Sequence, residues 1–93
     1  MDTILNLLKL DLGITHNLRD AFFIQLIQGT IEEIEKRGIN LNLNKASDQM
    51  LISDYSAWTY RKRQEDLPLA NNIQARLRNR IIEERILKQN GFN

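Results

Sequence analysis

Residues 51–63 read LISDYSAWTYRKR, and their pattern predicts a helix in the middle of the fold. At about 100° per residue, its bulky side chains share one face, and these are Leu51, Ile52, Tyr55, Trp58 and Thr59. The opposite face is small and consists of Ser53, Ser56 and Ala57, with Tyr60 beside them. Small residues let a neighbouring helix approach closely. We therefore expect a central helix over about residues 48–63, capped by Ser47 or Asp48 and packed between neighbours.

The composition is that of an ordinary globular domain, because 42% of the 93 residues are hydrophobic and 27% are charged. The sequence contains no Cys, which excludes a disulfide framework and a thiolate metal site. The N-terminal stretch MDTILNLLKLDLG is acidic at position 2 and broken by Asn6 and Lys9. We therefore expect neither a signal peptide nor a membrane span, and a soluble protein made in a cytoplasm.

Charge is distributed unevenly along the chain, although the net charge is only +1. Residues 1–59 carry a net charge of −3, and residues 60–93 carry a net charge of +4. This asymmetry suits a basic face for DNA, and it suits head-to-tail self-association equally well.

Three more helices are expected around the central one. The fold class is therefore all-α, a small bundle of three long helices plus one short N-terminal helix, in a single domain over residues 1–93. The short helix covers about residues 3–11, begins at Asp2 or Thr3 and is stopped by Gly13.

The second helix is expected over about residues 16–37, with Thr15 or Asn17 as its cap and Gly38 as its stop. Gly29 lies among large residues of this helix, where it suggests a close helix contact. The following stretch INLNLNK, residues 39–45, is expected to be a loop that tucks its apolar side chains onto the core.

The last helix is expected over about residues 68–89, with Asp66 as its cap, Pro68 in its first turn and a short tail at 90–93. It carries two apolar stripes. The first consists of Ala70, Ile73, Leu77 and Ile81, and the second of Ala75, Ile82 and Ile86. One stripe should pack on the central helix, and the other needs the short helix or a neighbouring subunit.

The apolar surface predicted for the second and last helices exceeds what one partner covers in so small a domain, and such a surplus indicates an interface. The candidates for a subunit interface are Phe23, Ile27, Ile31, Ala75, Ile82 and Ile86.

No catalytic, cofactor-binding or metal-binding constellation is visible in the sequence. His16 is the only His, and Asp11 and Asp20 alone do not complete a ligand set. A Gly-rich phosphate loop and a nucleophile–base pair are both missing from the sequence. We therefore expect no enzyme activity and no cofactor.

The basic run at the end of the central helix provides candidate phosphate contacts, namely Arg61, Lys62 and Arg63. The same run also suits a solvated helix end, where cations complement the helix dipole.

Four segments along the chain together carry a resemblance to a known protein family. They are LLKLDLGI at 7–14, IQGTIEEIE at 27–35 before a Gly stop, DYSAWTYRKR at 54–63, and IQARLRNRIIEERI at 73–86 after a Pro. In this order they resemble the head–tail connector family of tailed phages, the adaptor or head-completion proteins. The strongest part is the pattern D-Y-x-A-W-x-Y-R-x-R at 54–63.

The resemblance implies an all-α virion subunit that assembles in the host cytoplasm into a ring of about twelve copies below the portal protein. Such a ring extends the DNA channel, passes DNA without sequence specificity, contacts no membrane and docks the next connector or stopper protein. The resemblance also implies that the C-terminal segment reaches the portal, which makes Leu87, Lys88 and Phe92 the portal-contact candidates. The sequence departs from a channel that grips DNA, because it has no long basic tail or loop.

Two other functions stay open at this point. A small helical DNA-binding regulator or DNA-packaging accessory protein would use the arginines of residues 60–85 and lose duplex affinity steeply with salt. A toxin–antitoxin or anti-repressor type of partner binder would form a stable heterodimer.

Overall fold

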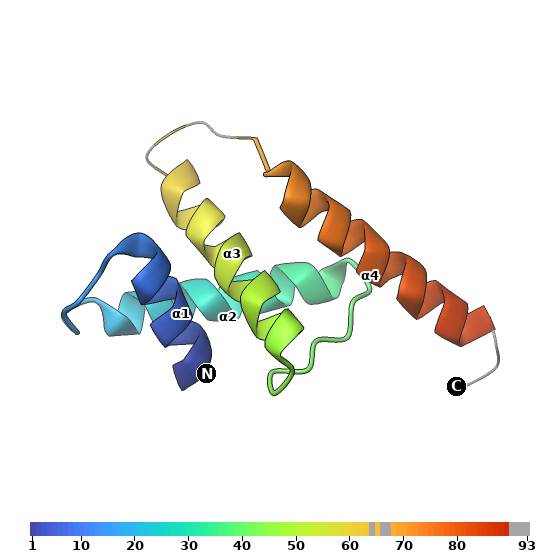
Figure 1. Cartoon of the computed structure of the whole chain (residues 1–93), viewed down its shortest axis with the longest axis horizontal. Helices are drawn as coiled ribbons and strands as arrows, with labels where there is room; N and C mark the ends of the chain where they lie inside the picture. The colour runs from blue at the N-terminus through green and yellow to red at the C-terminus, as the bar shows by residue number, and fades with distance from the viewer. Residues whose placement is uncertain (64, 66–67, 90–93) are drawn as a thin grey trace.

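A computed structural model describes residues 1–63, 65 and 68–89 of the chain, with only the backbone for residues 88–89. These residues form four helices and no strand: α1 (Asp2–Leu12), α2 (Asp20–Lys36), α3 (Ala46–Lys62) and α4 (Asn71–Gln89) (Figure 1). The all-α prediction is confirmed. The expected cap Asp66 and the expected tail at 90–93 lie outside the described residues.

Glycines end the first two helices, as the sequence predicts. Gly13 follows α1 with φ 72° and ψ 29°, and its backbone N–H donates to the carbonyl of Leu10. Gly38 follows α2 with φ 89°, and its N–H donates to the carbonyl of Glu35. Positive φ is readily adopted only by glycine, so both positions stop their helices by backbone geometry.

The first residues of three helices differ from the prediction. α4 begins at Asn71, so Pro68 lies before this helix and not in its first turn. At α2 and α3, one of the two expected caps serves other contacts. α2 begins at Asp20, later than expected, while the side chain of Asn17 accepts a hydrogen bond from Lys9 Nζ at 2.8 Å. α3 begins at Ala46, and Asp48 lies buried beyond the cap position. Tertiary contacts therefore override local capping preference here.

α3 is the central helix, as predicted, and packs on each of the other three (Figure 1). Its small face is fully covered, with Ser53, Ser56 and Ala57 all buried. Of its bulky face, Leu51, Ile52 and Tyr55 are buried, whereas Trp58 and Thr59 are half-buried. On the small face, Ser56 Oγ donates to Thr30 Oγ1 of α2 at 3.1 Å. Around α3 the core is apolar, and its fully buried members include Ile4, Leu8, Phe23, Ile27, Ile34 and Ile52.

The loop between α2 and α3 lies against the core through part of its length, as expected. Ile39 is buried and Leu41 is half-buried, whereas Leu43 is exposed. Helices α1 to α3 and this loop make up what we call the body.

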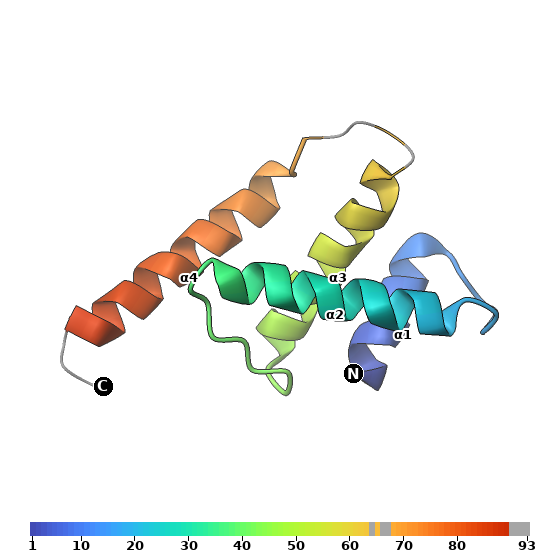
Figure 2. The ribbon, with the colours of Figure 1, turned by 180° about the vertical axis from the view of Figure 1, so that it is seen from behind.

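α4 stands beside the body rather than within it, and its far half extends away from the other helices (Figure 2). The molecule is consequently elongated and flat, with principal extents of 47 × 28 × 17 Å. This leaves one side of α4 without cover from its own chain.

Candidate assembly surfaces

One face of α4 packs on the body. We call Ala70, Ile73, Leu77 and Ile81 the inner stripe; Ile73 and Leu77 are buried, and the other two are half-buried against the core. This matches the first of the two stripes expected from the sequence. Burying such side chains is worth roughly 1.5–3 kcal/mol each, which attaches α4 along its first half.

A buried ion pair fixes the middle of α4. The Asp48 carboxylate, 1% exposed, pairs with the guanidinium of Arg80 and accepts a hydrogen bond from the backbone N–H of Asn42 at 2.8 Å. Arg80 also donates to the carbonyl of Asn40 at 2.7 Å. The pair therefore joins α3, α4 and the loop between α2 and α3.

Two further polar contacts lie on either side of that pair. Arg76 donates to the Asp54 carboxylate at 2.8 Å, and Glu84 accepts two hydrogen bonds from Asn40 at 3.2 Å. Near the start of α4, Trp58 Nε1 donates to the carbonyl of Pro68 at 2.8 Å. Contacts spread over this length set the orientation of α4 as well as its position.

The other face of α4 is largely uncovered. We call Ala75, Ile82 and Ile86 the outer stripe. Ile82 is 46% exposed and Ile86 is 48% exposed, while Ala75 is half-buried. Leu87, a portal-contact candidate, is 54% exposed. The side chain of Lys88 and all of Phe92 lie outside what the structure describes, so only Leu87 of that set can be placed.

The interface candidates on α2 need correction. Phe23 and Ile27 are fully buried in the core of their own chain, so they offer no surface to a neighbouring subunit. Ile31 is half-buried against the same core. α1 and α3 both pack on α2 and bury most of its wide apolar face.

The basic run at the end of α3 is exposed, but each of its cations contacts its own chain. Arg61 pairs with the Asp11 carboxylate at 3.2 Å. Lys62 Nζ lies 5.0 Å from the ring centroid of Trp58, and the Arg63 guanidinium lies 5.2 Å from that of Phe22. Through these contacts, all three residues help to hold the end of α3 against the neighbouring parts of the chain.

An aromatic cluster beside this run was not foreseen from the sequence. The rings of Phe22, Phe23 and Tyr60 pack together, with the Phe23 and Tyr60 centroids 5.5 Å apart. Arg19, directly before α2, lies 4.7 Å from the centroid of Phe22 and donates to Tyr60 Oη at 3.2 Å. The sequence could not predict this contact, because a single arginine before a helix belongs to no recognisable pattern.

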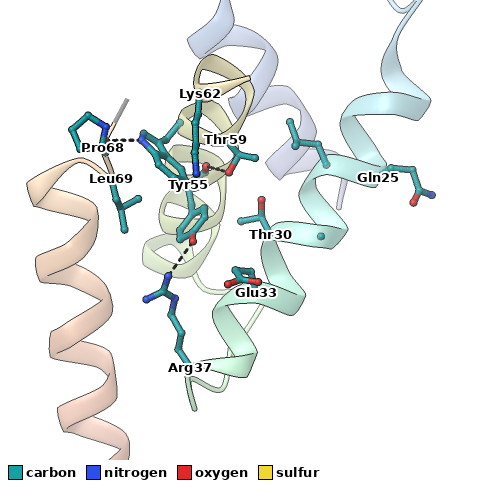
Figure 3. Close-up of a pocket in the computed structure, with 12 residues that line it drawn as sticks. Gln25, Thr30, Glu33, Arg37, Tyr55, Thr59, Lys62, Pro68 and Leu69 are labelled. Atoms are coloured by element: carbon teal, nitrogen blue, oxygen red, sulfur yellow. Dashed lines mark hydrogen bonds between the residues drawn. The ribbon is translucent and has the colours of Figure 1, made fainter. Parts of the chain in front are cut away.

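A groove opens between α2 and α3 and reaches the start of α4 (Figure 3). It has a volume of about 920 Å³. Figure 3 shows Thr30 and Glu33 of α2 lying toward Tyr55 of α3, whose hydroxyl accepts a hydrogen bond from Arg37 at 3.3 Å. The remaining lining residues are Gln25, Leu26, Gly29, Trp58, Thr59, Lys62, Pro68 and Leu69.

Gly29 lies in the wall of this groove on α2. Glycine inside a helix is less favourable than alanine by about 1 kcal/mol. A Cβ atom built at this position meets no atom within 4 Å, so the described chain packs nothing closely against it. The close helix contact suggested by the sequence is therefore not made inside the subunit.

Other kinds of site are sparse in the part of the chain that the structure describes. No group of three or more His, Cys, Asp or Glu side chains is placed there to hold a metal ion. No helix in those ranges is both long and apolar enough to cross a membrane. Comparisons with protein-family models, with curated proteins and with solved structures found no match for the chain.

Proposed function

We propose that this chain is a structural virion protein, the head–tail connector (adaptor) subunit of a tailed phage. The observation that carries the proposal is the outer stripe of α4. Ile82 and Ile86 stay exposed on a helix whose opposite face is fixed to the body by Leu77 and Arg80. A helix that is apolar on two faces and covered on one fits a subunit that is completed by assembly.

The shape of the subunit supports the same proposal. A ring uses heterologous contacts, so each copy needs two different surfaces that complement one another. The outer stripe and the groove between α2 and α3 are two such surfaces, and they belong to different elements. The net charges of −3 on residues 1–59 and +4 on residues 60–93 favour head-to-tail contact between copies.

The finer parts of the proposal come from the family resemblance. The ring has about twelve copies, lies below the portal, extends the DNA channel and offers a docking surface for the next connector or stopper protein. Its C-terminal segment, including Leu87, reaches toward the portal. The chain does no chemistry in this role and needs no cofactor.

Native mass spectrometry over a range of protein concentrations tests this function. A closed species near twelve copies supports it. Should the chain stay monomeric, the portal protein encoded in the same genome is added as a template, and an assembled portal complex is the expected result. A monomer that does not bind the portal protein, or a discrete dimer, would refute the connector proposal.

The exposed cations Arg61, Lys62 and Arg63 favour a second candidate, the DNA-binding regulator or packaging accessory protein. This candidate requires duplex binding that falls steeply with salt and is lost in Arg61→Ala/Arg63→Ala. The connector proposal requires weak binding that the double variant leaves nearly unchanged. A gel-shift series between about 50 and 200 mM salt separates the two.

A further inference from the structure

We propose that the groove between α2 and α3 receives the outer stripe of α4 from a second copy of this chain. The inference rests on the proposed function and specifies its subunit contact. It assigns the acceptor to residues of α2, of α3 and of the segment before α4, and the donor to Ile82 and Ile86.

The groove has the chemistry of a helix acceptor. Its lining includes the rings of Tyr55 and Trp58 and the apolar side chains of Leu26 and Leu69. Charged side chains, namely Glu33, Arg37 and Lys62, line it as well, so the groove offers both apolar and polar contacts, as protein interfaces do. An amphipathic helix lays its apolar face into grooves of this kind.

Gly29 indicates how closely the occupant approaches. Nothing within the described chain needs a glycine here, since a Cβ atom would stand in open space. A second helix backbone laid against α2 would account for the missing side chain, because small residues allow the closest helix contacts. The glycine thereby points to a helix as the occupant, rather than a small molecule.

The subunit's own α4 cannot supply that helix face. Ile86 lies nine residues after Leu77, which places it about 180° around the helix. Because Leu77 is buried on the body and Arg80 is held by Asp48, the outer stripe is turned away from its own core. The outer stripe of a second copy can reach the groove, because that copy is not attached to this body.

Charge favours a second copy as the source. Glu33 lies at the groove, with Glu32 next to it on α2, and the outer stripe is flanked by Arg78 and Arg85. Among the residues that the structure describes, none of these four side chains takes part in an ion pair. The groove lining also contains two cations, but the Arg37 guanidinium donates to the Tyr55 hydroxyl and the Lys62 ammonium lies over the Trp58 ring. Glu33 is therefore the charge of the lining that complements an arginine beside the donor stripe of a second copy.

The contact is heterologous, because each copy donates at α4 and accepts at α2 and α3. Repeating it adds copies head to tail, and the series closes into a ring when the rotation between copies allows. No copy in a closed ring keeps an empty groove or an uncovered stripe.

The first test replaces Gly29 by Gln, with Gln28→Ala as the matched control on an exposed position of the same helix outside the groove. Because Gln favours a helix and a Cβ atom at this position meets no atom within 4 Å, the melting temperature of the monomer should rise by about 3–6 °C. The same change should weaken self-association at least about tenfold by blocking close approach. Association that is unchanged or stronger in Gly29→Gln would overturn the inference.

The second test uses cysteines, which the natural chain lacks. Lys62→Cys marks the groove, Asn79→Cys marks the exposed surface of α4 beside the outer stripe, and Arg63→Cys is a control that removes the same charge next to the groove. Singly substituted chains are mixed and treated with a short bismaleimide. The 62–79 mixture should give a crosslinked heterodimer, and the 63–79 mixture should give little.

These outcomes separate the two proposals. Rings or portal complexes that form normally but give no 62–79 product would overturn the groove contact and leave the connector function standing. A 62–79 product together with a ring supports both. A chain that neither assembles, with or without portal, nor crosslinks at high concentration would refute both.

Discussion

Asp48 is a buried carboxylate at which three segments of the chain meet. It is 1% exposed, and its charge is compensated by Arg80 and by the backbone N–H of Asn42. Without Asp48, the Arg80 guanidinium keeps, among the residues that the structure describes, only the longer carboxylate contacts to Glu83 and Glu84, both at 3.8 Å. Removing one member of a largely buried ion pair is far more harmful than removing an exposed pair.

We therefore predict that Asp48→Ala lowers the free energy of unfolding by about 3–5 kcal/mol. Asp54→Ala is the matched control, because Asp54 also pairs with an arginine of α4 but both side chains are about one-third exposed. That change should lower it by about 1 kcal/mol or less. Urea titration of both variants measures the difference, and similar losses would contradict the assignment of Asp48 as the main polar attachment of α4.

The hydrogen bond from Ser56 to Thr30 gives a second prediction. Both residues are buried, and the hydroxyl groups join α3 to α2 at 3.1 Å. Ser56→Ala should lower the free energy of unfolding by about 1–3 kcal/mol, because it leaves the Thr30 hydroxyl without this partner. A double-mutant cycle with Thr30→Val should return a coupling energy of about 1 kcal/mol, and a coupling near zero would show that the bond is not formed in solution.

The two apolar stripes of α4 differ in their surroundings. The inner stripe attaches α4 to the body, whereas Ile82 and Ile86 of the outer stripe are 46% and 48% exposed. The two stripes therefore separate folding from assembly within one helix.

We predict that Ile82→Asp/Ile86→Asp abolishes self-association while the monomer keeps its helix content. Leu77→Ala is the matched change on the inner stripe and should lower the free energy of unfolding by about 2–5 kcal/mol. Circular dichroism and analytical ultracentrifugation measure the two properties separately. Loss of both properties, or of neither, in the Asp variant would show that the division into two stripes is wrong.

The existence of each helix could be predicted from apolar periodicity and from Gly13 and Gly38, whose effect is local. The starts of α2 and α3 could not, because the side chains of Asn17 and Asp48 are engaged by Lys9 and Arg80 from elsewhere in the chain. Capping preference is a small energy that such contacts outweigh.

Some of the candidate surfaces could likewise be predicted from the sequence, and others could not. The two stripes of α4 could be read from one segment, since each repeats at helical spacing. The burial of Phe23 and Ile27 could not be read in this way, because periodicity reveals an apolar face but not which element covers it. The groove could not be predicted from the sequence, because α2, α3 and the segment before α4, which line it, are brought together only by folding.

The elongated molecule carries the acidic Glu33 in the groove and the basic Arg78 and Arg85 beside the outer stripe. We expect self-association to respond to salt without depending on it entirely, because the contact combines apolar burial with exposed charges such as Glu33 and Arg85. Raising salt from about 0.05 to 0.5 M should weaken association on the order of tenfold, as measured by sedimentation. A loss of several orders of magnitude would indicate a contact made mainly by charges and would contradict an apolar groove.

The position of α4 after α1 to α3 also matters while the protein is being synthesised. A chain leaves the ribosome N-terminus first, so the helices of the body can begin to fold before α4 has emerged. Pro68 and Leu69, which complete the groove, come later, and the outer stripe comes later still. Neighbouring nascent chains on one messenger RNA therefore lack both halves of the proposed contact until α4 has emerged, which delays their association.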